Sequence, residues 1–177
     1  MAAILRELPF YQRPTTADFQ GRHIAIKPNQ IILWVCLTPG RQTEIDPGYP
    51  FFPAILDTGH THNFSIQEDH LVRWAGLDPR LLPRHREIRV GGDRLPLCQA
   101  DVWIRPNVRG QRDRPADRPP FRLPLDWGVA VYPRDVPHAP RLPLLGLRAL
   151  RLAGLHLAID CRRGAVTMRS ARRFWFF

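Results

Sequence analysis

The residues best suited to chemistry in this chain stand directly after a short apolar segment. Asp57 follows the apolar run 54–56 and is followed by Thr58 and Gly59. A carboxylate at the end of a buried strand can exchange protons with a bound water molecule or substrate. The same aspartate could also be a plain turn residue before a glycine. We therefore take Asp57 as the first candidate for acid–base chemistry.

Three histidines near Asp57 suggest a second kind of chemistry, which is metal binding. His60, His62 and His70 could be imagined as ligands together with the Asp57 carboxylate. However, His60 and His62 alternate along the chain and are expected to point to opposite faces. We therefore predict no metal site and no cofactor, and expect His62 to be a packed structural residue.

The segments around Asp57 are predicted to be mostly strands. Runs rich in apolar and β-branched residues, bounded by turn signals, favour strands at 23–27, 31–37, 51–56, 87–90, 100–104 and 125–132. One helix is predicted after Asp57. Ser65 and Glu68 have capping-box spacing at its start, and Gly76 is placed just past its end.

The C-terminal part repeats this pattern weakly. An apolar strand at 142–146 ends in a glycine, a short helix is predicted at 147–153, and Gly154 follows as its stop. A hairpin is predicted over 155–168. The first copy of the pattern carries an aspartate at the strand end and the second copy carries none.

Three pieces of the sequence together resemble one family. These are the Asp57, Thr58 and Gly59 signature after its apolar strand, the sequence 61–64, and Leu144, Leu145 and Gly146 followed by a helix. In order and spacing they resemble the retropepsin-like aspartic proteases of retroviruses, retrotransposons and many bacteria, here a bacterial-type member. The resemblance covers about residues 24–169.

The resemblance implies a fold and a domain organisation. It implies an all-β acid-protease domain that closes into a barrel, with one or two short helices and a flap hairpin. We expect this domain to span 21–177, with an N-terminal arm at 1–20 and an Arg- and Pro-rich insertion at about 105–122.

The resemblance also implies an aspartic endopeptidase. Two neighbouring carboxylates cannot both ionise, so they share a proton and together activate water for peptide hydrolysis. One chain supplies only Asp57, so the second carboxylate is expected from a homodimer mate on a two-fold axis. Asp101 and Asp126 are rival second carboxylates within the chain, but neither follows an apolar run ending in Thr-Gly or Ser-Gly, so we reject both. In the family's arrangement, Thr58 bonds across the dimer, and Gly59 lets backbone approach carboxylate and substrate.

An extended peptide or protein segment is the expected substrate. Gly91, Gly92 and Asp93 best match the tip of the flap, and Gly59 and His60 are expected to contact the peptide as well. His60 departs from the family pattern, in which serine or alanine usually follows the Asp-Thr-Gly signature. A bulkier, titratable side chain there is expected to raise the pH optimum, narrow a subsite or impair catalysis.

Charge offers a competing interpretation. The chain has 177 residues and a net charge of +10, and Lys27 is the single lysine among 26 basic residues. A basic protein can bind nucleic acid through phosphate neutralisation. The arginines are scattered, however, and no nucleic-acid-binding motif is present, so we expect no such partner. The run 105–122 is expected to be a solvated loop or insertion.

Composition also bears on location and on the remaining alternatives. Cys36, Cys98 and Cys161 are widely spaced, and no long apolar run is present, so we expect a cytoplasmic protein without a membrane partner. The aromatic end, Phe174–Phe177, is expected in the core or in a dimer sheet. Besides the protease, two functions stay open: a non-proteolytic dimerisation or peptide-binding module, and a basic nucleic-acid binder.

Overall fold

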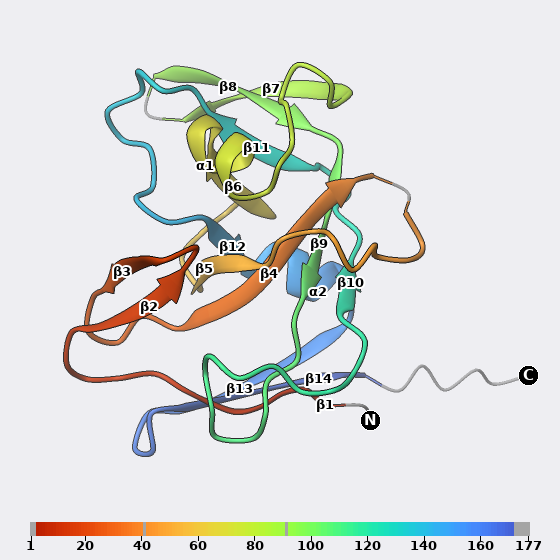
Figure 1. The fold of residues 1–177 in the computed structure, drawn as a ribbon. Helices are drawn as coiled ribbons and strands as arrows, with labels where there is room; N and C mark the ends of the chain where they lie inside the picture. Colours follow the sequence, from red (N-terminus) through yellow and green to blue (C-terminus); the bar gives the residue numbers. More distant parts are fainter. Residues whose placement is uncertain (1–2, 41, 91, 172–177) are drawn as a thin grey trace, which may run out of the picture.

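Strands make up most of the fold, as the sequence predicted. The computed structural model describes residues 3–40, 42–90 and 92–171. These residues form fourteen strands and two short helices, which confirms the all-β class (Figure 1). No helix in this part of the chain is long and apolar enough to cross a membrane.

The largest unit is a nine-stranded sheet of mixed direction. Its order is open, because β10 and β7 stand at opposite edges, so the predicted closed barrel is wrong for the described residues. The strands in spatial order are β10 (Phe121–Leu123), β9 (Ala100–Ile104), β4 (Ile32–Pro39), β5 (Phe52–Asp57), β12 (Leu144–Gly146), β6 (Phe64–Gln67), β11 (Val129–Tyr132), β8 (Asp93–Cys98) and β7 (Arg84–Val90).

Two smaller sheets complete the fold. One has the order β1 (Ala3–Pro9), β14 (Ala165–Ser170) and β13 (Leu155–Asp160), and the other is the hairpin of β2 (Thr15–Phe19) and β3 (Arg22–Ile26). The first sheet lies at the opposite end of the molecule from β7 and β8 (Figure 1). The predicted N-terminal arm, 1–20, contains β1 and β2. Leu5 and Leu8 of β1 are fully buried in the core.

The core is centred on β4 and β5, which explains their unbroken apolar sequences. Leu33, Val35 and Leu37 on β4 and Phe52 on β5 have no exposed surface. Strands covered on both faces favour continuous apolar runs rather than alternation. The predicted strand that ends at Asp57 is therefore confirmed as a central, buried strand.

The two short helices lie where the glycines indicated. α1 (Glu68–Arg73) is followed by Gly76 at φ +68°, and α2 (Leu147–Leu152) by Gly154 at φ +62°. Both glycine stops are confirmed. The capping box is wrong, because Ser65 lies within β6 and Gln67 is the N-cap of α1, without a side-chain cap.

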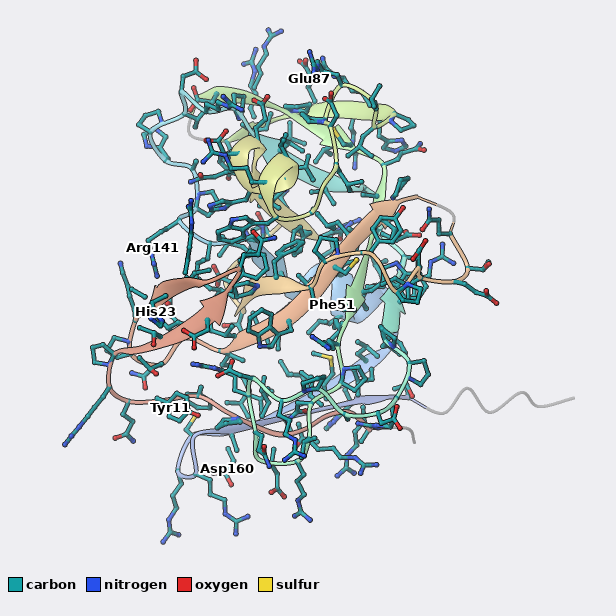
Figure 2. All side chains as sticks on the ribbon, in the orientation of Figure 1. Tyr11, His23, Phe51, Glu87, Arg141 and Asp160 are labelled. Atoms are coloured by element: carbon teal, nitrogen blue, oxygen red, sulfur yellow. The ribbon has the colours of Figure 1, made fainter. Side chains whose placement is uncertain are left out.

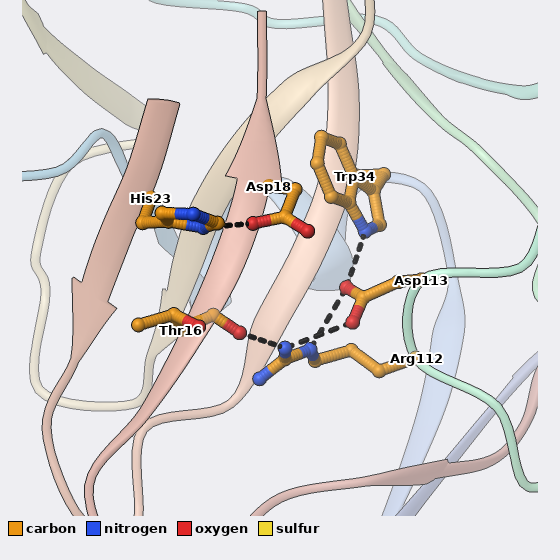
Figure 3. Close-up of polar contacts among 6 residues, drawn as sticks. All are labelled: Thr16, Asp18, His23, Trp34, Arg112 and Asp113. Atoms are coloured by element: carbon orange, nitrogen blue, oxygen red, sulfur yellow. Dashed lines mark hydrogen bonds and ion pairs between the residues drawn. The ribbon is translucent and has the colours of Figure 1, made fainter. Parts of the chain in front are cut away.

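The Arg- and Pro-rich segment is exposed at 109–111 and 113–115 but buried at 106, 107 and 112, so the prediction of a solvated loop or insertion is only partly right. Figure 3 shows the Arg112 guanidinium bonded to the Thr16 carbonyl of β2 and to Asp113, which in turn accepts a bond from the Trp34 indole. The Arg112 side chain is 5% exposed. An arginine can be buried when acceptors of this kind bind its guanidinium.

The hairpins follow the sequence with one exception. β13 and β14 form the predicted C-terminal hairpin, and β7 and β8 form another, with Gly92 at φ +97° in its turn. The exception is the predicted strand at 100–104, which joins neither hairpin and pairs with β4. Gly91 and Phe174–Phe177 lie outside the described residues. Figure 2 shows Glu87 on β7 and Asp160 on β13 at opposite ends of the molecule.

Candidate active site

Asp57 is the last residue of β5, directly before the loop 58–63, and its side chain is half-buried. Its Oδ1 accepts a hydrogen bond from the Gly59 N–H at 2.9 Å. Thr58 and Gly59 are exposed. The carboxylate is therefore fixed by the backbone of its own turn, while the two residues after it face outward and are accessible to another molecule.

The second half of the expected motif lies directly beside Asp57. β12 is inserted between β5 and β6, the two strands that flank the Asp57 loop. It pairs in parallel with β5, so that Gly146 is the register partner of Asp57. On its other side Leu145 pairs with Phe64 of β6. Two segments almost ninety residues apart in the sequence thus meet at the candidate site.

Gly146 is a glycine because the loop 58–63 passes over it. A Cβ at this position would lie 2.1 Å from the His62 carbonyl oxygen and 2.7 Å from the His60 carbonyl oxygen. The Gly146 N–H also donates to the Asn63 carbonyl at 3.0 Å. The absence of a side chain lets the backbone of the loop lie directly against β12, which sets the position of the loop relative to Asp57.

A polar network anchors the far end of this loop. The buried Asn63 side chain donates to Asp126 Oδ1 at 2.7 Å, and Arg148 at the start of α2 donates to Asp126 Oδ2 at 2.6 Å. Partial burial acts to raise the pKa of Asp126, but the bonds from Arg148 and Asn63 outweigh it, so that the pKa is lowered. The loop is thereby tied to α2 through an ionised carboxylate.

Trp127 connects this network to the β7–β8 hairpin. The Arg86 guanidinium of β7 lies 3.9 Å from the centre of the indole, and that of Arg148 lies 3.6 Å from it. Sequence reasoning missed the roles of Asp126, Trp127 and Arg148, because it weighed Asp126 only as a rival catalytic carboxylate. The sequence offered one signal for this network, which was the basic residue Arg148 two positions after Gly146.

The histidines after Asp57 face one another rather than opposite sides, so that prediction is wrong. The His60 and His62 rings are 5.5 Å apart and edge to face. His60 Nε2 is 2.8 Å from Ser65 Oγ. His62 Nδ1 is buried and has no hydrogen-bond partner among the described residues. His70 lies elsewhere, stacked on Trp74 with 3.7 Å between ring centres.

Both histidines of the loop are held in the neutral form. Burial, with a smaller contribution from His62, lowers the pKa of His60 to about 4, although Asp57 acts in the opposite direction. Burial and then Arg148 lower the pKa of His62. His60 therefore stays neutral across the pH range from about 5 upward and adds no positive charge beside Asp57.

This burial predicts a loss of stability in mild acid. An unfolded chain binds a proton at His60 near the ordinary pKa, whereas the folded chain does not, so stability falls as pH decreases from about 6.5 towards 4. We expect wild type to lose on the order of 1–2 kcal/mol more unfolding free energy than His60→Gln between pH 7 and pH 4.5. Urea titrations at the two pH values measure this difference.

The matched control for this prediction is His85→Gln, a substitution at an exposed histidine of β7. It should leave the pH-dependent loss of wild type unchanged. An equal loss in wild type and His60→Gln would contradict the assignment of a neutral, buried His60.

The other candidate residues are not brought to Asp57. Among the described residues, the hydrogen bond to the Asp57 side chain comes from Gly59, and none comes from Gly92 or Asp93. Asp101 is buried and accepts two hydrogen bonds from Arg122. Asp101 and Asp126 are thus both held by arginines.

Comparison of the chain with protein-family models, with curated proteins and with solved structures finds no match.

Proposed function

We propose that the protein is an aspartic endopeptidase of retropepsin type that acts as a homodimer. The observation that carries the proposal is the register of β12 against β5, in which Gly146 stands beside Asp57 and under the loop that follows it. This arrangement joins the two halves of the motif by which the sequence resembles the retropepsin-like family. It also leaves Thr58 and Gly59 exposed toward a second molecule.

The second carboxylate of the site is proposed to be Asp57 of another copy. Within the chain, Asp101 is paired with Arg122 and Asp126 with Arg148, so that neither carboxylate is free to share a proton with Asp57. A two-fold axis beside the exposed turn would place two identical Asp57 carboxylates together. Only one of them can be ionised at a time when they are about 3 Å apart.

In this mechanism the ionised Asp57 removes a proton from a water molecule between the two carboxylates. The water oxygen attacks the carbonyl carbon of the peptide bond, while the protonated Asp57 donates its proton to the carbonyl oxygen. The tetrahedral intermediate then collapses: the Asp57 that took the water proton gives it to the leaving nitrogen as the C–N bond breaks, and the other Asp57 takes a proton from a hydroxyl of the intermediate. The Gly59 N–H holds one carboxylate oxygen during these steps.

The substrate class proposed is an extended, unfolded peptide segment. The β7–β8 hairpin, with Gly92 in its turn, is the proposed flap, which would bond the peptide backbone as an added strand. The stacking of Arg86 and Arg148 on Trp127 connects this hairpin to the base of the site. Closure of the flap would exclude bulk water from the scissile bond and leave the water molecule between the two carboxylates in place.

The test is cleavage of a reduced, carboxymethylated protein between pH 4 and pH 7, with and without a pepstatin-type inhibitor. We expect cleavage by wild type, its loss with inhibitor, and its loss in Asp57→Ala. Leu81→Ala, at an 82% exposed position, is the control and should cleave like wild type. Cleavage by Asp57→Ala equal to that of wild type would exclude the proposal.

One observation favours a non-proteolytic module as the second candidate. His60 occupies a position that is small in the family, and its half-buried ring contacts Ser65 and His62. A dimer that binds peptides but leaves them intact, in both wild type and His60→Ala, would select that function. Recovery of cleavage in His60→Ala alone would show that the histidine restrains an intact protease site.

A further inference from the structure

The β7–β8 hairpin carries more positive than negative charge. Its arginines outnumber its carboxylates, and these charged residues are Arg84, Arg86, Arg89, Arg94, Glu87 and Asp93. Elsewhere in the fold arginines form ion pairs, as Arg122 does with Asp101. Among the described residues no ion pair holds an arginine of the hairpin. The hairpin therefore presents positive charge that the chain itself does not neutralise.

Two of these arginines lie directly opposite each other. Arg89 of β7 is the register partner of Arg94 of β8, and both side chains are exposed. The next pair along the hairpin, Ile88 and Leu95, has Leu95 fully buried, so this pair faces inward and the two arginines face outward. The Cα atoms of directly opposed residues are about 4.5–5.5 Å apart, and like charges at that distance destabilise a sheet.

The other charged groups of the hairpin do not relieve this repulsion. Glu87, two residues from Arg89, shares the outer face and lies at the outer end of the molecule in Figure 2, but no described arginine pairs with it. Arg86 lies on the inner face, where it stacks on Trp127. An unrelieved pair of exposed arginines indicates a surface for an anionic partner.

The same hairpin also provides a free strand edge. β8 pairs with one side of β7, and no strand of the described part of the chain pairs with the other side. No described segment outside the hairpin forms a backbone hydrogen bond with 84–90. β7 thus presents unpaired N–H and C=O groups. Its arginines discourage pairing with a strand of like charge but favour a strand of opposite charge.

We propose that the free edge of β7 binds an extended acidic segment of another protein, which adds to the sheet as a further strand. A carboxylate of the segment would lie beside Arg89 on the outer face, and Arg94 would add to the attraction from the neighbouring strand. Because this hairpin is the proposed flap, naming such segments as substrates rests on the proposed function. The binding itself does not involve Asp57.

The two faces of β7 define the sequence that the added strand should have. Alternate side chains of that strand share the outer face with Arg89, and those between them lie beside the half-buried Ile88. Acidic side chains that alternate with small apolar ones fit both faces. Positive charge alone would also attract nucleic acid. Nucleic acid lacks the backbone with which a sheet edge pairs, so the free edge favours a protein segment.

Fluorescence anisotropy with a designed peptide measures this binding. The probe is a fluorescein-labelled peptide of alternating Glu and Val, titrated with the full-length Asp57→Asn chain so that the peptide stays intact. We expect saturable binding that weakens with salt. A Lys–Val peptide of the same length should not bind. A Glu–Pro peptide should bind at least about tenfold more weakly, because proline lacks the N–H that strand pairing needs.

Reversal of the two opposed charges tests the residues. Arg89→Glu together with Arg94→Glu, in the Asp57→Asn chain, should weaken binding of the Glu–Val peptide by at least about tenfold, because attraction becomes repulsion. The matched control is Arg13→Glu together with Arg162→Glu, which changes the net charge equally at two exposed positions outside the hairpin. It should bind like its parent. Circular dichroism checks that both variants are folded.

The opposed arginines also make a prediction for the free protein. Arg94→Glu alone replaces a repulsive pair by an attractive one, so it should raise the urea midpoint of unfolding while it weakens binding of the Glu–Val peptide. A lower midpoint would contradict the repulsion between Arg89 and Arg94. The reason for placing a carboxylate beside them would then be lost.

The outcomes separate this proposal from the protease. Binding of the Glu–Val peptide that depends on Arg89 and Arg94, without cleavage of any peptide or unfolded protein by wild type, supports the acidic-segment site and overturns the proposed function. Cleavage of Glu–Val and Lys–Val peptides at equal rates, unaffected by the two reversals, overturns this site and leaves the protease standing. Equal binding of Glu–Val and Glu–Pro peptides, or tighter binding of oligodeoxythymidine, also overturns it.

Discussion

Asp57→Asn is expected to abolish peptide cleavage, with a loss of about 10²- to 10⁴-fold, while leaving the chain folded. The amide keeps the shape of the side chain and retains an oxygen that can accept the Gly59 N–H. It cannot take a proton from water or share one with a second carboxylate. Initial rates of cleavage of an unfolded protein, with thermal unfolding as the folding check, measure both parts of the expectation.

A shared site makes a stronger prediction for mixed subunits. When equal amounts of wild type and Asp57→Asn exchange subunits at random, about a quarter of the dimers carry two aspartates. Activity should therefore fall to about a quarter of that of the same total amount of wild type, rather than to the half expected if each chain worked alone. A value of one half would contradict the shared carboxylate pair, even if Asp57→Asn alone is inactive.

The elements around Asp57 were predictable because local signals and burial agree there. The run before Asp57 is continuously apolar, as a central strand requires, and Gly76 and Gly154 mark helix ends by their need for a positive φ. Leu144, Leu145 and Gly146 were identified from the sequence as a strand that ends in glycine. Their pairing with Asp57 was not predictable from spacing alone, because register depends on contacts between distant segments.

The features that the sequence did not predict depend on tertiary contacts, which override local sequence patterns. Ser65 has the spacing of a helix cap, but it lies in β6 between β12 and β11, where strand pairing determines its conformation. Arg112 lies in a segment of polar composition, yet its guanidinium donates to the Thr16 carbonyl and to Asp113 inside the fold. Asn63 and Asp126 meet across more than sixty residues, and no local signal reports such a contact.

Gly146→Ala is expected to have the largest effect on stability, with a loss of about 3 kcal/mol or more of unfolding free energy. The new Cβ would lie 2.1 Å from the His62 carbonyl oxygen and 2.7 Å from that of His60, and both are backbone atoms. They cannot rotate away as a side chain does, so the whole loop 58–63 must move. Urea denaturation at pH 7, compared with wild type, measures the loss.

The same displacement should reach Asp57, because the loop that Gly146 supports also carries the Gly59 N–H that holds the carboxylate. Gly40→Ala is the matched control: its nearest contact would be 3.7 Å, an ordinary packing distance, and its cost should stay within about 0.5 kcal/mol. If Gly146→Ala folded with wild-type stability, the close passage of the loop over β12 would be refuted. The two halves of the motif would then no longer be held together at one site by this contact.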